Sequence, residues 1–300
     1  MGNLVTSKEY DYFERKKVIN ALCKEYGFIK SSVIGKSCGG KDIQALRIGS
    51  SDTYCLIAAA FHGSERITAT VTLMYIEELC RAIKNDGFLA GIKVRKALTG
   101  RGVLFVPCVN PDGCDISLLG AKACGSEAAK ICNLCKGDFA HWNANLRGVD
   151  INHNFDAGWE ALRETEKKNG ILGPGPTRYG GERSHSEPET KALVELCKKT
   201  NIRHCMALHS QGEVIYWNFG DRTPPKARKM AEIMATSSGY ALDAPIALAT
   251  GGGFKDWFIK EFARPGFTVE IGKGRNPLPA ETAYDIYSRI REMLVLYTVM

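Results

Sequence analysis

Four short segments of this chain are almost continuously apolar, with no alternation between apolar and polar residues. They are 54–61, 103–109, 204–208 and 267–271. Strands that are covered by helices on both faces show this pattern, which is typical of parallel sheets. We therefore predict that the four segments form the centre of one sheet.

Apolar residues also recur at helical spacing before and between these segments. The pattern i, i+3, i+4, i+7 occurs within 19–26, and 76–83 carries apolar residues on one helical face. Ser186 is predicted to open another helix, because Glu189 three residues later would complete a capping box. Helices between buried strands are the connections that parallel strands require.

The remaining chain predicts an edge hairpin and a long functional loop. Two strand-like segments, 32–34 and 43–48, flank a turn rich in glycine. The segment 111–181 is rich in Gly, Asn and Pro with little periodicity, and we expect it to shape the rim of an active site. With 300 residues and 44% hydrophobic content, we predict a single α/β domain over 1–300, an α/β/α sandwich around a mixed, mostly parallel central sheet.

Charge and cysteine content limit which partners and which cellular compartment we expect for the protein. The net charge is +7, but basic residues are interspersed with acidic ones, so nucleic acid is not indicated as a partner. No apolar run approaches the ~20 residues of a membrane span, and the polar N-terminus lacks a signal-peptide pattern. The 11 cysteines cannot all pair, which favours a reducing compartment. We expect a cytoplasmic protein with no membrane partner, and we leave the oligomeric state open.

Polar side chains stand at the ends of three buried segments, where α/β sheets gather their functional groups. His62 follows the first segment, His209 follows the third, and Glu270 lies within the fourth. His62 and Glu65 form an H-x-x-E pair, and a second histidine from another strand would complete a His/Glu/His set for Zn²⁺ with the fourth position open. Each feature alone is weak, since a single histidine after a strand is more often packed or on the surface.

The order and spacing of several motifs make the pattern specific. They are H-x-x-E at 62–65, N-P-D-G at 110–113, G-V-D-x-N at 148–152, the later histidine at 209 and F-T-x-E at 267–270. Over about residues 40–290 this combination resembles the zinc metallocarboxypeptidase family. The resemblance implies a zinc carboxypeptidase-like fold and a zinc metallopeptidase that hydrolyses peptide bonds.

The resemblance also implies roles for individual residues. His62, Glu65 and His209 would hold one Zn²⁺, which polarises water and the scissile carbonyl. Glu270 matches the family's general base, which takes a proton from water and passes it to the leaving amine. Arg147 is a candidate to stabilise the oxyanion. A structural salt bridge is the alternative for Glu270, and a surface salt bridge is the alternative for Arg147.

Several positions depart from the family's usual substrate-binding pattern. The family typically has Asn-Arg after G-V-D-x, whereas this chain has Asn152 and His153, so a bidentate carboxylate clamp is lost. Leu248 stands where a tyrosine usually covers the substrate. Lys255 stands where the family reads the substrate side chain; its ammonium suits a carboxylate, and a solvated lysine is the alternative. These four residues are the candidate substrate-binding residues.

These departures, together with the sequences at 179–181, 186–190 and 267–279, resemble the bacterial γ-D-glutamyl-L-diamino acid endopeptidases. That branch cleaves peptidoglycan stem peptides between γ-D-glutamate and meso-diaminopimelate, which implies a peptide or muropeptide substrate. A general metallocarboxypeptidase and a zinc N-acyl amino acid amidohydrolase stay open as other enzymes. A catalytically silent muropeptide-binding protein is the alternative that is not an enzyme.

Overall fold

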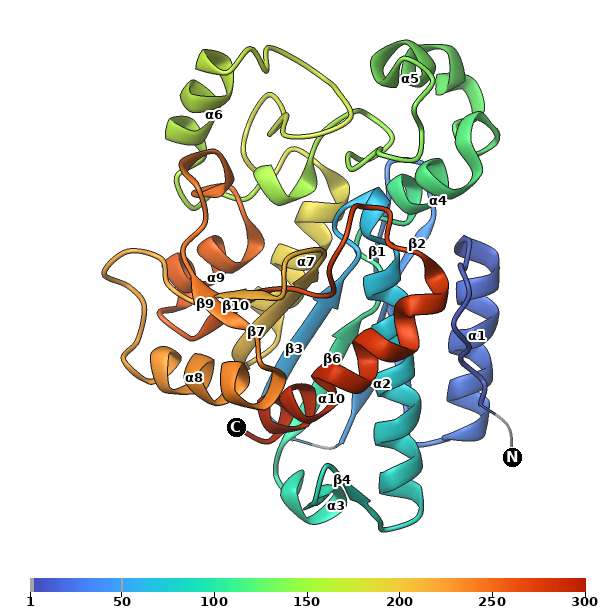
Figure 1. Ribbon diagram of the computed structural model, residues 1–300, viewed down its shortest axis with the longest axis vertical. Coiled ribbons are helices and arrows are strands. Elements are labelled where there is room, and N and C mark those ends of the chain that lie inside the picture. The colour runs from blue at the N-terminus through green and yellow to red at the C-terminus, as the bar shows by residue number, and fades with distance from the viewer. Residues whose placement is uncertain (1–2, 50) are drawn as a thin grey trace.

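The computed structural model describes residues 3–49 and 51–300, and a twisted sheet runs through its middle (Figure 1). The sheet has eight strands in the order β1-β2-β6-β3-β7-β10-β8-β9. Its strands are β1 (Lys30–Lys36), β2 (Asp42–Ile48), β3 (Tyr54–Ala59), β6 (Gly102–Val106), β7 (Ile202–His209), β8 (Val214–Tyr216), β9 (Ala241–Asp243) and β10 (Gly266–Glu270). A small separate hairpin consists of β4 (Phe88–Leu89) and β5 (Ile92–Lys93).

The strands at the centre of the sheet are parallel, and antiparallel pairs lie toward both ends. β6, β3, β7 and β10 are parallel neighbours. β1 pairs with β2, β2 pairs with β6 and β8 pairs with β10 in antiparallel register, whereas β9 is parallel to β8. The predicted mixed, mostly parallel sheet and the hairpin at its edge are therefore confirmed. All four apolar segments predicted as central strands occupy these central positions.

Helices cover both faces of the sheet, and α2 and α10 cross in front of it in Figure 1. The helices are α1 (Tyr12–Glu25), α2 (Ile67–Lys84), α3 (Val94–Ala97), α4 (Pro111–Leu119), α5 (Ala128–Cys135), α6 (Trp159–Lys168), α7 (Pro188–Lys199), α8 (Lys226–Ser238), α9 (Phe254–Phe262) and α10 (Ala283–Val299). Among the described residues, no helix has the length and apolar character needed to cross a membrane.

The central strands supply two hydrophobic cores, because successive side chains of a strand point to opposite faces. In β3, Cys55 and Ile57 join the core formed with α1, α2, α8 and α10. Leu56 and Ala58 join the core formed with α7 and α9. All four side chains are fully buried. This two-sided burial is the physical reason for the unbroken apolar runs of the sequence.

Two sequence predictions need correction. The segment 111–181 is not a continuous loop, since it contains α4, α5 and α6, which lie at the top of Figure 1. The capping box predicted at Ser186 and Glu189 is also wrong. α7 begins at Pro188, whose nitrogen has no hydrogen to satisfy at the first helical position, and Ser186 donates to the Glu187 carboxylate at 2.8 Å.

Glu189 instead joins a buried polar cluster, which we define as Cys38, Asn145, Glu187 and Glu189. The Asn145 amide donates to both carboxylates, at 2.8 Å to Glu187 and 3.1 Å to Glu189. The backbone N–H of Cys38 donates to Glu189 at 2.8 Å. Burial, reinforced by the charge of Asp112, raises the pKa of Glu189 to about 7. The cluster therefore favours a protonated Glu189 in the folded protein.

Replacing Glu189 with Gln is expected to remove a pH-dependent loss of stability. The unfolded carboxyl releases its proton near pH 4.5 and the folded one near pH 7, so folded-state stability is lost as pH rises through this window. The size of this effect is at most about 3 kcal/mol. Urea unfolding at about pH 5 and about pH 8 should show Glu189→Gln gaining stability relative to the native protein as pH rises. Glu195→Gln, on the exposed face of α7, is the control and should show no such gain.

Candidate active site

Three neighbouring parallel strands present polar side chains at the same edge of the sheet. His62 lies just beyond β3, His209 is the last residue of β7, and Glu270 is the last residue of β10. Glu270 and His209 are register partners in the parallel pair of β10 and β7. Carboxyl ends of parallel strands are where α/β sheets bind ligands. The fold therefore brings together groups that are far apart in the sequence.

The turn after β3 depends on very close packing of backbone segments. His62 is followed by a short 3₁₀ helix, Gly63–Glu65, which leads into α2. A Cβ atom on Gly63 would lie 2.2 Å from the carbonyl oxygen of Gly113, so only glycine fits there. The buried side chain of Asn110 donates to the carbonyl of Phe61 at 3.0 Å, which fixes the residue before His62. The N-P-D-G motif thus supports the turn that carries His62.

Two imidazoles and one carboxylate converge at this edge. Nδ1 of His62 lies 2.8 Å from Oε1 of Glu65, and Nδ1 of His209 lies 2.9 Å from Oε2 of Glu65. The two Nδ1 atoms are 3.3 Å apart. Glu65 and His209 are buried, whereas the His62 side chain is partly exposed. The three predicted metal ligands are therefore in mutual contact, with one side open.

The His62 ring is oriented by Asp150, a buried residue of the G-V-D-x-N motif that was not among the predicted site residues. Nε2 of His62 lies 3.0 Å from Oδ1 of Asp150, and the backbone N–H of Arg178 donates to Oδ2 at 2.8 Å. Burial opposes the charge on Asp150, but His62 and His153 hold the pKa of this carboxyl well below its usual range. The G-V-D-x-N motif was the available signal, since a carboxylate commonly orients a metal-binding histidine from behind.

The residues present fit a metal ion. With Nε2 of His62 donating to Asp150, Nδ1 of a neutral ring carries a lone pair directed at Glu65 and His209. Electron-rich atoms this close repel one another unless a proton or a cation lies among them. Burial lowers the pKa of His62, but the carboxylates of Glu65 and Asp150 raise it well above its usual range. The two carboxylates therefore favour a positive charge at this position. Two imidazole nitrogens and a carboxylate are a ligand set typical of catalytic zinc.

Glu270 stands beside this group as a carboxylate that is not among the candidate ligands. It is half-buried, and the neighbouring Glu65 is close enough to affect its titration. Burial raises the pKa of Glu270 well above its usual range, and the charge of Glu65 raises it further, whereas His62 lowers it. A carboxylate with a raised pKa next to a metal-binding group has the properties of a general acid or base.

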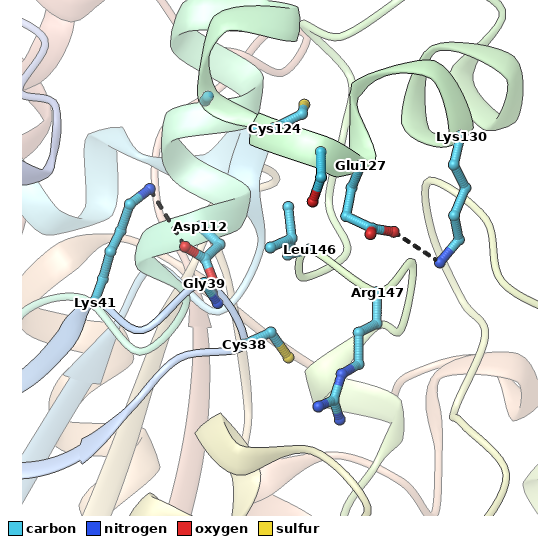
Figure 2. Close-up of a pocket in the computed structure, with 12 residues that line it drawn as sticks. Cys38, Gly39, Lys41, Asp112, Cys124, Glu127, Lys130, Leu146 and Arg147 are labelled. Carbon is cyan, nitrogen blue, oxygen red and sulfur yellow. Dashed lines mark hydrogen bonds and ion pairs between the residues drawn. The ribbon is translucent and has the colours of Figure 1, made fainter.

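The side chain of Arg147 is exposed and contacts a carboxylate outside this group. Its side chain is 58% exposed, and Nη1 lies 3.6 Å from Oε2 of Glu187. Figure 2 shows it at a pocket with Cys38 on one side and Glu127 and Lys130 on another. The residues that line this pocket of about 710 Å³ do not include His62, Glu65 or His209. These contacts match the surface salt bridge that the sequence left as an alternative, and they give no support to oxyanion stabilisation by Arg147.

His153 also differs from the substrate-facing position implied by the resemblance. It is buried, and its Nδ1 lies 2.8 Å from Oε1 of Glu166, a residue of α6. Glu166 is fully buried, and it also pairs with Arg163 and accepts from the backbone N–H of Gly180 at 3.1 Å. The imidazole is thus part of an internal network that holds α6, and these contacts give no support to the prediction that it binds substrate.

The other candidate substrate-binding residues lie around the N-terminus of α9. Oδ1 of Asn152 accepts from the backbone N–H of Phe254 at 3.0 Å. Lys255 is buried, and its ammonium donates to the carbonyl of Asn218 at 2.8 Å and pairs with Asp256. Lys255 is therefore not a solvated lysine. Leu248 is half-buried in the short 3₁₀ helix Ala247–Ala249.

An α/β sheet that presents two histidines, a glutamate and an adjacent carboxylate at its carboxyl edge has the features of a metal-dependent hydrolase. A model of the zinc carboxypeptidase family matches residues 16–292. The chain therefore belongs to the zinc carboxypeptidase family. It is a metallopeptidase of the class that uses one catalytic zinc ion.

Individual relatives agree with this membership. Gamma-D-glutamyl-L-diamino acid endopeptidase 1 from Lysinibacillus sphaericus is 35% identical over 285 residues, covering 93% of this chain and 70% of that protein. Among solved structures, bovine thrombin-activatable fibrinolysis inhibitor in complex with tick carboxypeptidase inhibitor matches with a TM-score of 0.76 and 18% identity, covering 97% of both chains. Murein-tripeptide amidase MpaA from Escherichia coli O157 matches with a TM-score of 0.53 and 20% identity, covering 87% of this chain and 91% of that one. The two structures share the fold.

Proposed function

We propose that this protein hydrolyses peptidoglycan stem peptides at the bond between γ-D-glutamate and meso-diaminopimelate. The observation that carries the proposal is the convergence of His62, Glu65 and His209 beside Glu270 in a chain 35% identical to a γ-D-glutamyl-L-diamino acid endopeptidase. In this proposal the three converging residues bind zinc and Glu270 is the general base. The region 1–300 would work as one peptidase unit.

The chain's own residues would divide the remaining work. When bound, zinc supplies Lewis-acid chemistry that polarises a carbonyl and makes water more acidic. Glu270 would accept a proton from the attacking water and donate it to the departing amine nitrogen. Asp150 would keep the proton of His62 on Nε2, so that Nδ1 stays free for the metal. Asn152 has its Oδ1 engaged by the backbone N–H of Phe254, and its amide hydrogens would donate to a substrate.

The candidate substrate-binding residues favour hydrolysis of the bond between γ-D-glutamate and diaminopimelate over hydrolysis of the C-terminal bond of an ordinary peptide. His153 is directed to Glu166, so the chain lacks a guanidinium at the position that grips a terminal carboxylate in the family. Lys255 places a buried cation at the position that reads the substrate side chain, and an ammonium has three donors. Asn218 and Asp256 occupy two of them. The third would bind the side-chain carboxylate of diaminopimelate.

Replacing Lys255 with Met is expected to weaken hydrolysis of diaminopimelate-containing substrates more than of lysine-containing ones. Lysine lacks the side-chain carboxylate, so only the diaminopimelate substrate loses a charge-assisted hydrogen bond, worth about 1.5 to 3 kcal/mol. The ratio of kcat/KM for the two substrates should fall by about 10-fold to 100-fold. Lys260→Met, an exposed change on the same helix, is the control. Equal losses on both substrates would exclude this role for Lys255.

The proposal as a whole is tested with the tripeptide L-Ala-γ-D-Glu-meso-diaminopimelate and the purified zinc-loaded protein. Mass spectrometry should detect free diaminopimelate and the dipeptide L-Ala-γ-D-Glu. Removal of C-terminal residues from ordinary peptides, with the tripeptide left intact, would instead identify a general carboxypeptidase. Hydrolysis confined to N-acyl amino acids would identify an amidohydrolase. Zinc binding without hydrolysis of any of these would identify a silent binding protein.

We also propose that the protein works in a reducing compartment such as the cytoplasm. All 11 cysteines are free, among them Cys108 and Cys114, whose sulfur atoms lie 3.7 Å apart. Thiols this close tend to pair in oxidising compartments. The chain has an odd number of cysteines, 11, which cannot all pair, and this supports a compartment that keeps thiols reduced.

A further inference from the structure

Two cysteines outside the zinc group lie close enough to react with each other. Sγ of Cys108 and Sγ of Cys114 are 3.7 Å apart, and both residues are buried. Cys108 lies in the turn after β6, and Cys114 lies in the first half of α4. A disulfide requires sulfur atoms about 2 Å apart, so a small rotation or shift of the side chains would join them.

A buried cation lies next to this pair. Arg15 of α1 is only 3% exposed, and its Nη1 donates to the carbonyl of Tyr10 at 3.0 Å. Its Nη2 has no hydrogen-bond partner within residues 3–49 and 51–300, and the nearest carboxylate, that of Asp115, is 4.0 Å away. An unpaired guanidinium N–H in the interior is costly unless an anion faces it. A thiolate would provide that anion.

The charges around Cys108 favour its thiolate. Burial raises the pKa of Cys108, but the hydrogen bond with Cys114 and the positive charges of Arg15 and Lys41 outweigh burial and lower it below its usual value. The pKa of Cys114 is shifted in the opposite direction, because its sulfur shares a proton with Cys108 and is itself buried. The two sulfurs are therefore not equivalent. Cys108 is the nucleophile, since the thiolate is the reactive form.

Access to the pair is narrow, and Cys108 is the member of the pair that lines it. A crevice of about 10 Å³ is lined by Arg15, Pro107, Cys108 and Pro111, together with residues of α1 and β2. Cys114 is not among its lining residues. A space of this size admits a molecule about as large as water. Hydrogen peroxide is a small oxidant that a slight widening of this crevice would admit, whereas bulky disulfides are excluded.

We infer that Cys108 and Cys114 form a peroxide-sensitive dithiol site, in which Cys108 is oxidised first and Cys114 closes the disulfide. The Cys108 thiolate attacks one oxygen of hydrogen peroxide, the O–O bond breaks, and the released hydroxide takes up a proton to become water. The resulting sulfenic acid is attacked by the sulfur of Cys114. The S–S bond forms, the S–O bond breaks, and the hydroxyl leaves with the Cys114 proton as a second water. Two thiols and one peroxide thus give one disulfide and two waters.

The site is connected to the turn that carries His62. Cys108 and Cys114 pack against Ala60 in one small cluster. The backbone N–H of Val109 donates to the carbonyl of Ala59 at 2.9 Å, and that of Asn110 donates to Ala60 at 3.0 Å. Drawing Cys108 toward α4 therefore strains the segment just before His62. Disulfide formation is expected to weaken zinc retention.

The test maps disulfides after the zinc-loaded protein is treated with stoichiometric hydrogen peroxide. Free thiols are blocked under denaturing conditions, the protein is reduced, and newly released thiols receive a second, isotopically distinct label. Peptide mass spectrometry should find the second label on Cys108 and Cys114 together. In a Cys114→Ala variant, Cys108 should instead stay a sulfenic acid, which dimedone traps once the peroxide-treated protein is unfolded in its presence.

The exposed residue Cys132 is the internal control, because oxidation governed by exposure alone would modify it first. Preferential labelling of Cys132, or of Cys132 with Cys135, would overturn the inference. Zinc content measured on the same samples should fall in the native protein and recover after thiol treatment and zinc addition. A Cys108→Ala/Cys114→Ala variant should keep its zinc under the same peroxide, and an equal loss in that variant would overturn the connection to His62. Neither measurement depends on which peptide bond the enzyme cleaves.

Discussion

Glu270→Gln is expected to lower kcat by about 10²-fold to 10⁴-fold, the usual contribution of a general base. An amide has nearly the shape of a carboxylate but cannot take a proton from water. Glu270 is next to His209 in the sheet and is not among the candidate ligands, so zinc content should stay at the native level. A loss of kcat with little change in KM would place the defect in the chemical step.

The control for this change is Glu213→Gln, at the same end of the neighbouring strand β8. Glu213 is a half-buried carboxylate paired with Lys273 at 2.9 Å, so its replacement tests the general effect of losing a charge in this region. Its kcat should stay within a few-fold of the native value. Unchanged turnover in Glu270→Gln would remove Glu270 from the mechanism, and loss of zinc in that variant would make it a ligand instead.

The arrangement of the strands and of the candidate metal ligands was predictable because it depends on local sequence. A strand buried on both faces must be apolar, so 54–61 and its counterparts stood out. A polar residue directly after such a run, as with His62 and His209, has to lie at the end of a strand. Parallel strands end at one edge of the sheet, so these residues had to lie near one another.

The side-chain directions were less predictable, because partners distant in the sequence decide them. Arg147 lies three positions before Asp150, yet it points toward Glu187 and solvent. His153 follows the same motif, but the buried carboxylate of Glu166 draws its ring inward. Nothing in the local pattern of these residues indicates such partners. The placement of a side chain is therefore easier to predict from a motif at a strand end than in a long connection.

The start of α7 is a second case in which the local sequence did not predict the structure correctly. Ser186 and Glu189 have the spacing of a capping box, but Pro188 is a better first helical residue, and it shifts the start of the helix. Glu189 then falls on the buried side, where Cys38 and Asn145 bind it. A tertiary contact thus replaced the local one that the spacing predicted.

Removal of zinc by a chelator is expected to abolish hydrolysis, and addition of one equivalent of zinc should restore it. We expect the bound zinc to be the group that polarises the scissile carbonyl and the attacking water. The thermal unfolding temperature should fall on chelation, because a ligand that binds only the folded state stabilises it by mass action. His209→Ala should show the same loss without restoration by zinc. His141→Ala, an exposed histidine paired with Asp138, should behave as the native protein does.

The variant Asp150→Asn tests whether a residue that orients a zinc ligand, but does not bind zinc itself, affects zinc affinity. Asp150 contacts only the far nitrogen of His62 among the candidate ligands, so the variant keeps all three ligands. Loss of such an orienting carboxylate weakens metal binding by about 10-fold to 100-fold. Competition with a chromophoric chelator should reveal this weaker affinity, and saturating zinc should recover most of the activity. An unchanged zinc affinity in Asp150→Asn would exclude the orienting role of Asp150. In the chelation experiment, full activity of the metal-free protein would exclude the zinc mechanism.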